Sequence, residues 1–224
     1  MAELRGIILL LCTIAFHVSH GQIRWTLLNQ ITGESDVIPL SNNTPLNVSL
    51  NFKLMNILEA DTEKDQVEVV LWTQASWKVP YYSSLLSSSS LDQVSLPASK
   101  MWTPDLSFYN AIAAPELLST DRVVVSKDGS VIYVPSQRVR FTCDLINVDT
   151  EPGATCRIKV GSWTFDNKQL ALITGEEGVV NIAEYFDSPK YDLLSATQSL
   201  NRKKYRCCEN MYEDIEITFA FRKK

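Results

Sequence analysis

Two adjacent cysteines stand between tyrosines near the carboxyl end of the chain, in the stretch from Tyr205 to Tyr212. Neighbouring Cα atoms in a trans peptide are about 3.8 Å apart, which is less than the roughly 4.4–6.8 Å that most disulfides span. A bond between Cys207 and Cys208 would therefore close a small ring that stiffens a turn and cannot join distant strands. The alternative is that each cysteine pairs elsewhere and that their adjacency is accidental.

The first 21 residues have the pattern of a secretory signal. Arg5 supplies a positive charge, an apolar run follows from Ile7 to Phe16, and the small residues Ser19 and Gly21 stand at the cleavage positions. We therefore expect a secreted mature chain that starts near residue 22. The apolar run is shorter than the roughly 20 residues that a membrane helix needs, and no later stretch approaches that length, so no membrane span is expected.

Removal of residues 1–21 takes away one of five cysteines and leaves an even number for an oxidising compartment, namely Cys143, Cys156, Cys207 and Cys208. Four cysteines allow three pairings. A bond between Cys143 and Cys156, which leaves the adjacent cysteines to each other, is favoured because no cysteine then has to reach a distant part of the fold. The other two pairings stay open on these grounds alone.

The same cleavage removes both histidines, His17 and His20, so the mature chain has no imidazole. Ser-His-Asp and Cys-His catalysis and histidine-ligated zinc all need that group. A secreted enzyme would then need a carboxylate pair of the glycosidase kind, and nothing in the sequence marks one. We expect no catalytic residues and no cofactor, with calcium binding by an acidic pair as the minor alternative. The net charge of −5 and the absence of a long basic run argue against a nucleic-acid partner.

Apolar residues recur with a helical period from Ile23 to Ile31 and with the two-residue period of strands in the rest of the chain. Strands are predicted over Leu46–Leu54, Val67–Trp77, Val123–Val125, Val131–Val134, Arg138–Leu145, Arg157–Trp163, Lys168–Ile173 and Ile215–Phe221. An Asp-Gly pair between two of them is typical of a hairpin turn. The pattern predicts one all-β domain over residues 22–224, an immunoglobulin-like antiparallel β-sandwich with a short N-terminal α-helix.

Several polar stretches are predicted to lie at the surface. Tyr82–Ser90 contains six serines and is expected to be an exposed loop. The acidic pairs Glu176-Glu177 and Glu213-Asp214 are expected at solvated loops or strand ends. Asn42 and Asn47 begin glycosylation sequons, and the second sits on the polar face of a predicted strand.

Four motifs in order now point to one family. They are Trp102-Thr103-Pro104-Asp105, the Cys143–Cys156 pair with twelve residues between, Gly161-Ser162-Trp163, and Tyr205 with Cys207-Cys208 and Tyr212. With them the chain resembles the extracellular ligand-binding domain of the Cys-loop receptors over essentially the whole mature chain. The resemblance is strongest to nicotinic acetylcholine receptor α subunits and to the acetylcholine-binding proteins of molluscs. It implies disulfides 143–156 and 207–208.

The resemblance also implies a ligand and a set of ligand-binding residues. The ligand would be acetylcholine or another nicotinic agonist or antagonist, held by aromatic faces because a quaternary ammonium cannot donate a hydrogen bond through its nitrogen. One face of the subunit would supply Tyr109, Trp163, Tyr205, Cys207, Cys208 and Tyr212, with Trp163 as the main cation–π partner. The opposite face would supply Trp72, Val124, Ile132, Val134 and Tyr185.

Since both faces belong to one sequence, neighbouring copies would have to meet in a homo-oligomeric ring, and the resemblance implies a pentamer in the synaptic cleft or extracellular fluid. No membrane helix follows Lys224 in this sequence, so capture of the transmitter without channel activity is expected.

Residue type alone would instead place Trp72, Trp163 and Tyr109 in the core, together with Trp77 and Trp102. The alternative function is an adhesion or lectin-like sandwich, which predicts no affinity for small amines.

Overall fold

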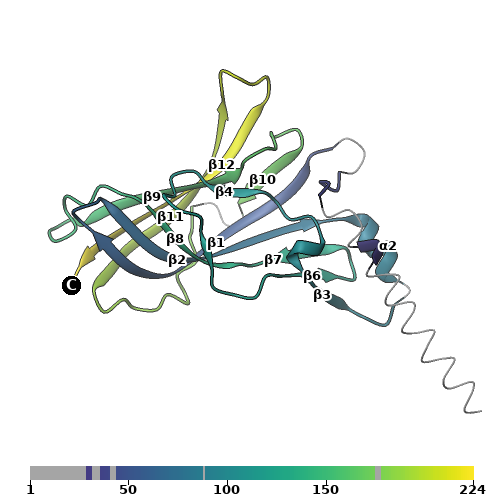
Figure 1. Ribbon diagram of the computed structural model, residues 1–224, viewed down its shortest axis with the longest axis horizontal. Coiled ribbons are helices and arrows are strands. Elements are labelled where there is room, and N and C mark those ends of the chain that lie inside the picture. Colours follow the sequence, from purple (N-terminus) through teal and green to yellow (C-terminus); the bar gives the residue numbers. More distant parts are fainter. Residues whose placement is uncertain (1–28, 32–35, 41–43, 88, 175–177) are drawn as a thin grey trace, which may run out of the picture.

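The computed structural model describes residues 29–31, 36–40, 44–87, 89–174 and 178–224 of the chain. Strands dominate these residues, with one short helix between the second and third strands (Figure 1). The elements are β1 (Leu46–Asp61), β2 (Gln66–Lys78), α2 (Pro80–Ser87), β3 (Gln93–Pro97), η1 (Ala98–Lys100), β4 (Leu106–Phe108), β5 (Glu116–Leu117), β6 (Arg122–Ser126), β7 (Ser130–Tyr133), β8 (Ser136–Thr142), β9 (Ala154–Ser162), β10 (Leu170–Thr174), β11 (Tyr191–Lys204) and β12 (Met211–Lys223).

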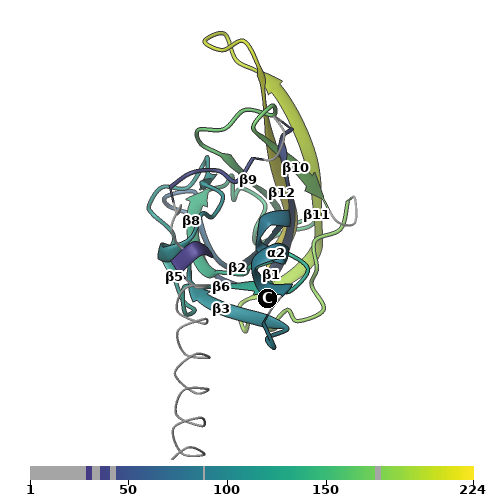
Figure 2. The ribbon, with the colours of Figure 1, turned by 90° about the vertical axis from the view of Figure 1, so that its right-hand side faces the viewer.

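The strands form two sheets that surround the interior (Figure 2). The eight-stranded sheet has the order β10-β1-β2-β7-β6-β3, and β8 joins it by pairing with β2 and β5. The four-stranded sheet has the order β11-β12-β9-β4. All pairings are antiparallel except that of β1 with β10. The predicted β-sandwich is therefore confirmed.

Alternation of buried and outward side chains builds the core between the sheets. In β1, Phe52 and Leu54 are buried, and Lys53 between them points away from the core. Phe141 on the eight-stranded sheet meets Phe219 on the four-stranded sheet edge to face, with ring centroids 6.1 Å apart. Such pairs add about 0.5–1.5 kcal/mol beyond the burial of their surface, so this contact helps to hold the two sheets together.

The prediction that Tyr82–Ser90 is an exposed loop was wrong, because α2 covers Pro80–Ser87 and ends within this stretch. Tyr82 and Leu86 are both buried. They are four residues apart, so they share one face of a helix. Pro80 stands at the first helical position, where its missing N–H costs nothing. Two of the six serines, Ser83 and Ser84, lie between the buried positions of this short helix, and the other four follow Leu86.

Strand β11 was not predicted, although it is one of the longest in the chain. It is the edge strand of the four-stranded sheet, and only Tyr191 and Gln198 along it are buried. Such an edge strand shows little of the apolar alternation that reveals the other strands. Its neighbour is β12, whose residues pair with it from Tyr191↔Lys223 to Lys204↔Met211.

The two tryptophans that were expected in the core are buried there. Trp77 and Trp102 meet edge to face with their centroids 5.5 Å apart. The predicted N-terminal helix lies mostly outside the described residues, of which 29–31 are helical. None of the helices in the described ranges has both the length and the apolar character to cross a membrane.

Candidate functional site

Four of the predicted ligand-binding aromatic residues gather at one side of the four-stranded sheet. Tyr109 follows β4, Trp163 follows β9, and Tyr205 and Tyr212 belong to the β11–β12 hairpin. The rings of Tyr109 and Trp163 are 6.2 Å apart, centroid to centroid, and those of Tyr205 and Tyr212 are 5.8 Å apart. We call these four residues the aromatic cluster.

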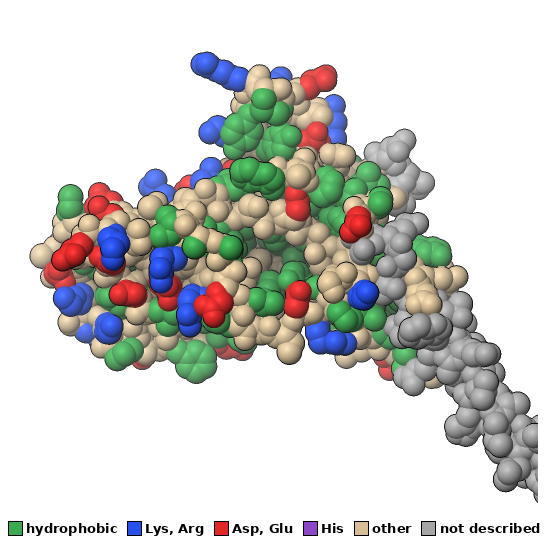
Figure 3. Space-filling model, viewed as in Figure 1, with side chains coloured by type: hydrophobic (Ala, Val, Ile, Leu, Met, Phe, Trp, Pro, Cys, Tyr) green, Lys and Arg blue, Asp and Glu red, His purple; other side chains and the backbone are tan. Residues whose placement is uncertain are grey.

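The cluster is open to solvent in the single chain. Trp163 is 69% exposed, and the hairpin projects away from the body of the molecule (Figure 1). The space-filling view shows apolar side chains gathered along this hairpin and at its base (Figure 3). Assignment of Trp163 to the core, which its residue type alone suggests, is therefore wrong.

Asp105 holds the turn that carries Trp163. Its carboxylate accepts hydrogen bonds from the Ser162 hydroxyl at 2.6 Å, and from the Thr164 backbone N–H at 2.8 Å and hydroxyl at 2.6 Å. The backbone N–H of Trp163 donates to the backbone oxygen of Asp105. Hydrogen bonds to an ionised group are the strong ones, so the residues on both sides of Trp163 are fixed to one carboxylate.

Tyr109 is held against the same turn. Its hydroxyl donates to the backbone oxygen of Ser162 at 2.9 Å, and its N–H donates to the backbone oxygen of Lys159. A Cβ at Gly161 would lie 2.5 Å from the Tyr109 hydroxyl oxygen, so only glycine permits this approach. Burial raises the pKa of Tyr109 to about 12, with smaller contributions from nearby Tyr205 and acidic groups. The phenol is therefore neutral and a hydrogen-bond donor at physiological pH.

The tip of the hairpin carries the adjacent cysteines. Cys207 and Cys208 are joined by a disulfide, with their Cα atoms 3.8 Å apart. The second disulfide joins Cys143 and Cys156, whose Cα atoms are 5.3 Å apart. In the loop between β11 and β12, the Asn210 side-chain amide donates to the Asp166 carboxylate at 2.7 Å, so the hairpin is attached to the turn that follows Trp163.

Glu213 and Asp214 are buried, with 6% and 2% of their surfaces exposed, which corrects the prediction of a solvated strand end. They lie within β12, between β11 and β9. Glu213 accepts hydrogen bonds from the Leu172 N–H at 2.7 Å and from the Arg202 guanidinium at 2.8 Å. Asp214 lies 3.3 Å from the Lys159 ammonium and accepts a hydrogen bond from Asn201 at 3.0 Å. Buried carboxylates need such partners, and partners on other strands are invisible in a local sequence pattern.

Four of the five residues predicted for the opposite face lie on the eight-stranded sheet or directly after one of its strands. Trp72 on β2, Val124 on β6 and Ile132 on β7 alternate with buried neighbours, so they share the side of the sheet that faces away from the core. Val124 and Ile132 are directly opposite across their hairpin. Val134 follows β7 and is exposed. We call these four residues the sheet-face set.

The sheet-face set and the aromatic cluster belong to different sheets, and among the described residues no ring contact joins Trp72 to the cluster. Tyr185 lies in a third place, where its ring packs against the core. Burial, and secondarily Asp187, raises the pKa of Tyr185. Sequence reasoning missed Lys53, whose ammonium lies 5.4 Å from the centroid of the Trp72 ring.

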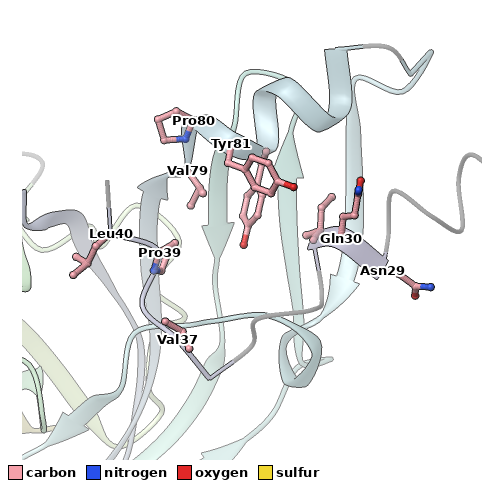
Figure 4. A pocket seen from close by; sticks show the side chains of 10 residues that line it. Asn29, Gln30, Val37, Pro39, Leu40, Val79, Pro80 and Tyr81 are labelled. Carbon is pink, nitrogen blue, oxygen red and sulfur yellow. The ribbon is translucent and has the colours of Figure 1, made fainter. Parts of the chain in front are cut away.

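A hollow of about 520 Å³ lies elsewhere, at the end of the molecule that carries α2 (Figures 1 and 4). Its lining comes from residues 29–31, from Val37, Pro39 and Leu40, and from Val79 with the start of α2, where Tyr81 points into it (Figure 4). No member of the aromatic cluster or the sheet-face set contributes to it. Among the described residues, no group of three His, Cys, Asp or Glu side chains is placed to hold a metal ion.

Comparison with known families decides the assignment. The sequence-family model of the neurotransmitter-gated ion-channel ligand binding domain matches residues 24–224. The chain belongs to this family. Neurotransmitter-gated ion-channel ligand binding domains are binding modules, and this chain is a binding protein rather than an enzyme.

Relatives in this ligand-binding-domain family include nicotinic receptor subunits. The chain is 26% identical to neuronal acetylcholine receptor subunit alpha-3 of Carassius auratus over 83% of its length. It is 28% identical to acetylcholine receptor subunit alpha-type acr-16 of Caenorhabditis briggsae over 96% of its length. It spans only 37% and 44% of those two subunits. The resemblance to the Cys-loop receptor ligand-binding domain is confirmed.

A crystal structure of AChBP from Bulinus truncatus is also similar to this ligand-binding domain. The two share 96% sequence identity and superpose with a TM-score of 0.85. The similarity covers 90% of this chain and 99% of that one. The resemblance to this group of proteins is thus confirmed in sequence and in fold.

Proposed function

We propose that the chain binds acetylcholine and other small quaternary or protonated amines. The observation that carries this proposal is the aromatic cluster, in which Tyr109 pairs edge to face with an exposed Trp163 and Tyr205 pairs edge to face with Tyr212. The receptor subunits that the chain resembles are named for acetylcholine. The ligand is accordingly a cation that aromatic faces can attract.

The chemistry of the cluster suits a quaternary ammonium. Such an ion has no N–H to donate, so an aromatic face attracts it through the ring quadrupole, with about 2 kcal/mol or more per ring when water is excluded. Trp163 is the main partner because tryptophan has the strongest quadrupole and because this ring is the most exposed of the large aromatic groups in the cluster. Tyr205, Tyr212 and the Cys207–Cys208 tip close over the ligand.

The site is completed by a second copy of the chain. The sheet-face set supplies the other wall, with Trp72 as the second aromatic partner and Val124, Ile132 and Val134 as an apolar back wall; Tyr185 approaches from the segment after Asn181. Because the cluster and the sheet-face set are different surfaces, copies associate head to tail, and such an interface forms a ring when the rotation between copies closes. The ring has five subunits, as the family resemblance implies.

The protein acts outside the cell. Residues 1–21 direct secretion, residues 22–224 form the ligand-binding domain, and glycans are attached at Asn42 or Asn47. The Asn47 side chain is exposed at the start of β1, while Asn42 lies outside the described residues. The secreted protein captures transmitter and so modulates cholinergic signalling without acting as a channel.

Intrinsic tryptophan fluorescence during titration with acetylcholine and with nicotine tests this function. The account expects a saturable change in emission, because Trp163 and Trp72 both contact the ligand, and it expects reduction of Cys207–Cys208 to weaken binding. Native mass spectrometry of the same sample should show a closed ring. An unchanged spectrum at saturating ligand, with binding to glycans or proteins that is indifferent to reduction, would favour the adhesion or lectin-like alternative.

A further inference from the structure

The face of the Trp72 ring already carries a cation of its own chain. The Lys53 ammonium lies 5.4 Å from the ring centroid, within the roughly 6 Å at which cation–π attraction operates. Lys53 and Trp72 are directly opposite in the antiparallel pairing of β1 with β2. Side chains opposite each other in such a pair lie on the same face of the sheet, so the register of the first two strands places the lysine beside the ring.

Glu184 holds the lysine from the other side. The Lys53 ammonium lies 3.0 Å from a carboxylate oxygen of Glu184. The segment that carries Glu184 runs along β1, where the Asn181 N–H donates to the backbone oxygen of Phe52 and a parallel bridge joins Asn181 to Lys53. The Lys53 side chain is only 24% exposed. A lysine held between a carboxylate and an aromatic face has a defined position and does not merely trail in solvent.

Lys203 lies 5.1 Å from the centroid of Tyr205 in a related arrangement. Lys203 is exposed near the tip of the hairpin, whereas Lys53 is fixed by backbone pairing, an ion pair and the ring. The position of Lys53 is therefore the better determined of the two. It also sits on the ring that the proposed function assigns to the second wall of the ligand site.

We propose that Lys53 is an internal competitor for cationic ligands, which sets the affinity and the charge selectivity of the Trp72 half of the site. An ammonium that binds over Trp72 must displace the Lys53 ammonium or share the ring with it, and two like charges at one ring repel each other. Glu184 limits this repulsion by neutralising the lysine. The inference rests on the proposed amine-binding role of Trp72.

The decisive variant is the double substitution Lys53→Met with Glu184→Gln. It frees the ring and leaves the local net charge unchanged, because one positive and one negative group are removed together. We expect tetramethylammonium and acetylcholine to bind about three- to fivefold more tightly than to the unaltered protein, the effect of an exposed cation–π contact. The affinity for 3,3-dimethylbutyl acetate, in which carbon replaces the ammonium nitrogen of acetylcholine, should not rise.

The two single substitutions distinguish the effect of freeing the Trp72 ring from the effect of the Glu184 charge. Lys53→Met alone should raise the affinity for acetylcholine at least as much as the double variant, since Glu184 is then unpaired and attracts the ligand. Glu184→Gln alone should lower that affinity about two- to threefold, because the lysine charge over the ring is no longer neutralised. The matched control is Lys64→Met with Asp61→Asn, an ion pair of 2.7 Å in the β1–β2 turn, which should leave both affinities unchanged.

Three outcomes are informative. If the unaltered protein binds acetylcholine but the double variant binds it no more tightly, Lys53 is not a competitor and the proposed function stands. If the unaltered protein binds no amine, both proposals fail. If the double variant does not fold, NMR of lysine-labelled unaltered protein decides: the Lys53 side-chain signals, shifted by the Trp72 ring current, should move on saturation with tetramethylammonium, and no movement would overturn the inference.

Discussion

The aromatic cluster is held in place by polar contacts, whereas the sheet-face set is positioned by strand register. Trp163 follows the end of β9, and its position depends on the three hydrogen bonds that Asp105 accepts from Ser162 and Thr164. Trp72 lies within β2, and its position follows from pairing with β1 and β8. The first half of the site is therefore sensitive to single polar residues, and the second half tolerates changes around its side chains.

Of the changes that test this difference between the two halves, replacement of Trp163 by alanine should lower the affinity for acetylcholine the most. The variant loses the main cation–π face, worth about 2 kcal/mol or more, so the affinity for acetylcholine should fall at least about thirtyfold, to the point where binding is no longer detected. Isothermal titration calorimetry measures the loss, and size-exclusion chromatography should show an unchanged oligomer. Tyr81→Ala removes an exposed aromatic group at the α2 end and serves as the control. Equal losses in both variants would contradict a specific role for Trp163.

Asp105→Asn should weaken binding about tenfold without touching the ligand. The amide nitrogen cannot accept a hydrogen bond, so either Ser162 or Thr164 loses its partner and Trp163 is no longer held in one position. Asp61→Asn is the matched control, because Asp61 also accepts backbone hydrogen bonds in a turn. Calorimetric titration of both variants checks the expectation. Unaltered affinity in Asp105→Asn would mean that the turn keeps its shape without this carboxylate.

Trp72→Ala should weaken binding less, by several-fold, because the ring shares its face with Lys53 and because the sheet around it does not change. Trp72→Phe should recover part of the loss, since a smaller aromatic face remains. Competition against a fluorescent nicotinic ligand measures both variants. A loss as large as that of Trp163→Ala would show that the two halves contribute equally.

The smallest expected effect is on the free energy of unfolding at high pH, and it comes from Tyr109. Its folded pKa is about 12 and lies above the ordinary value of 10.0. Between pH 10 and pH 12 the unfolded phenol ionises and the folded one stays protonated, so the free energy of unfolding should decline across this window. Urea unfolding of the protein and of Tyr109→Phe tests this, and the decline should be smaller in the variant. Identical profiles would place the phenol in contact with solvent.

Alternation of apolar residues predicted most of the strands that face the core, although it missed β3, where Val94 and Leu96 are buried. It failed for β11, where both faces are largely exposed, and for α2, where serines hide the i, i+4 pair of Tyr82 and Leu86. The ligand-binding aromatic residues were found only through resemblance to a family. The contacts that position them, namely Asp105 with Ser162 and Glu184 with Lys53, join residues far apart in sequence, so no local pattern predicts them.

Co-expression of Trp163→Ala chains with Trp72→Ala chains tests most directly whether the amine site is shared between neighbouring copies. Each chain lacks one half of the site, so rings of either variant alone should bind acetylcholine poorly. In mixed rings, about a quarter of the interfaces join an intact cluster from one chain to an intact sheet-face set from the other, given random assembly of a heterologous ring. Recovery of unaltered affinity at about that fraction of sites is the predicted result. Mixed rings with no sites of unaltered affinity would contradict a shared site.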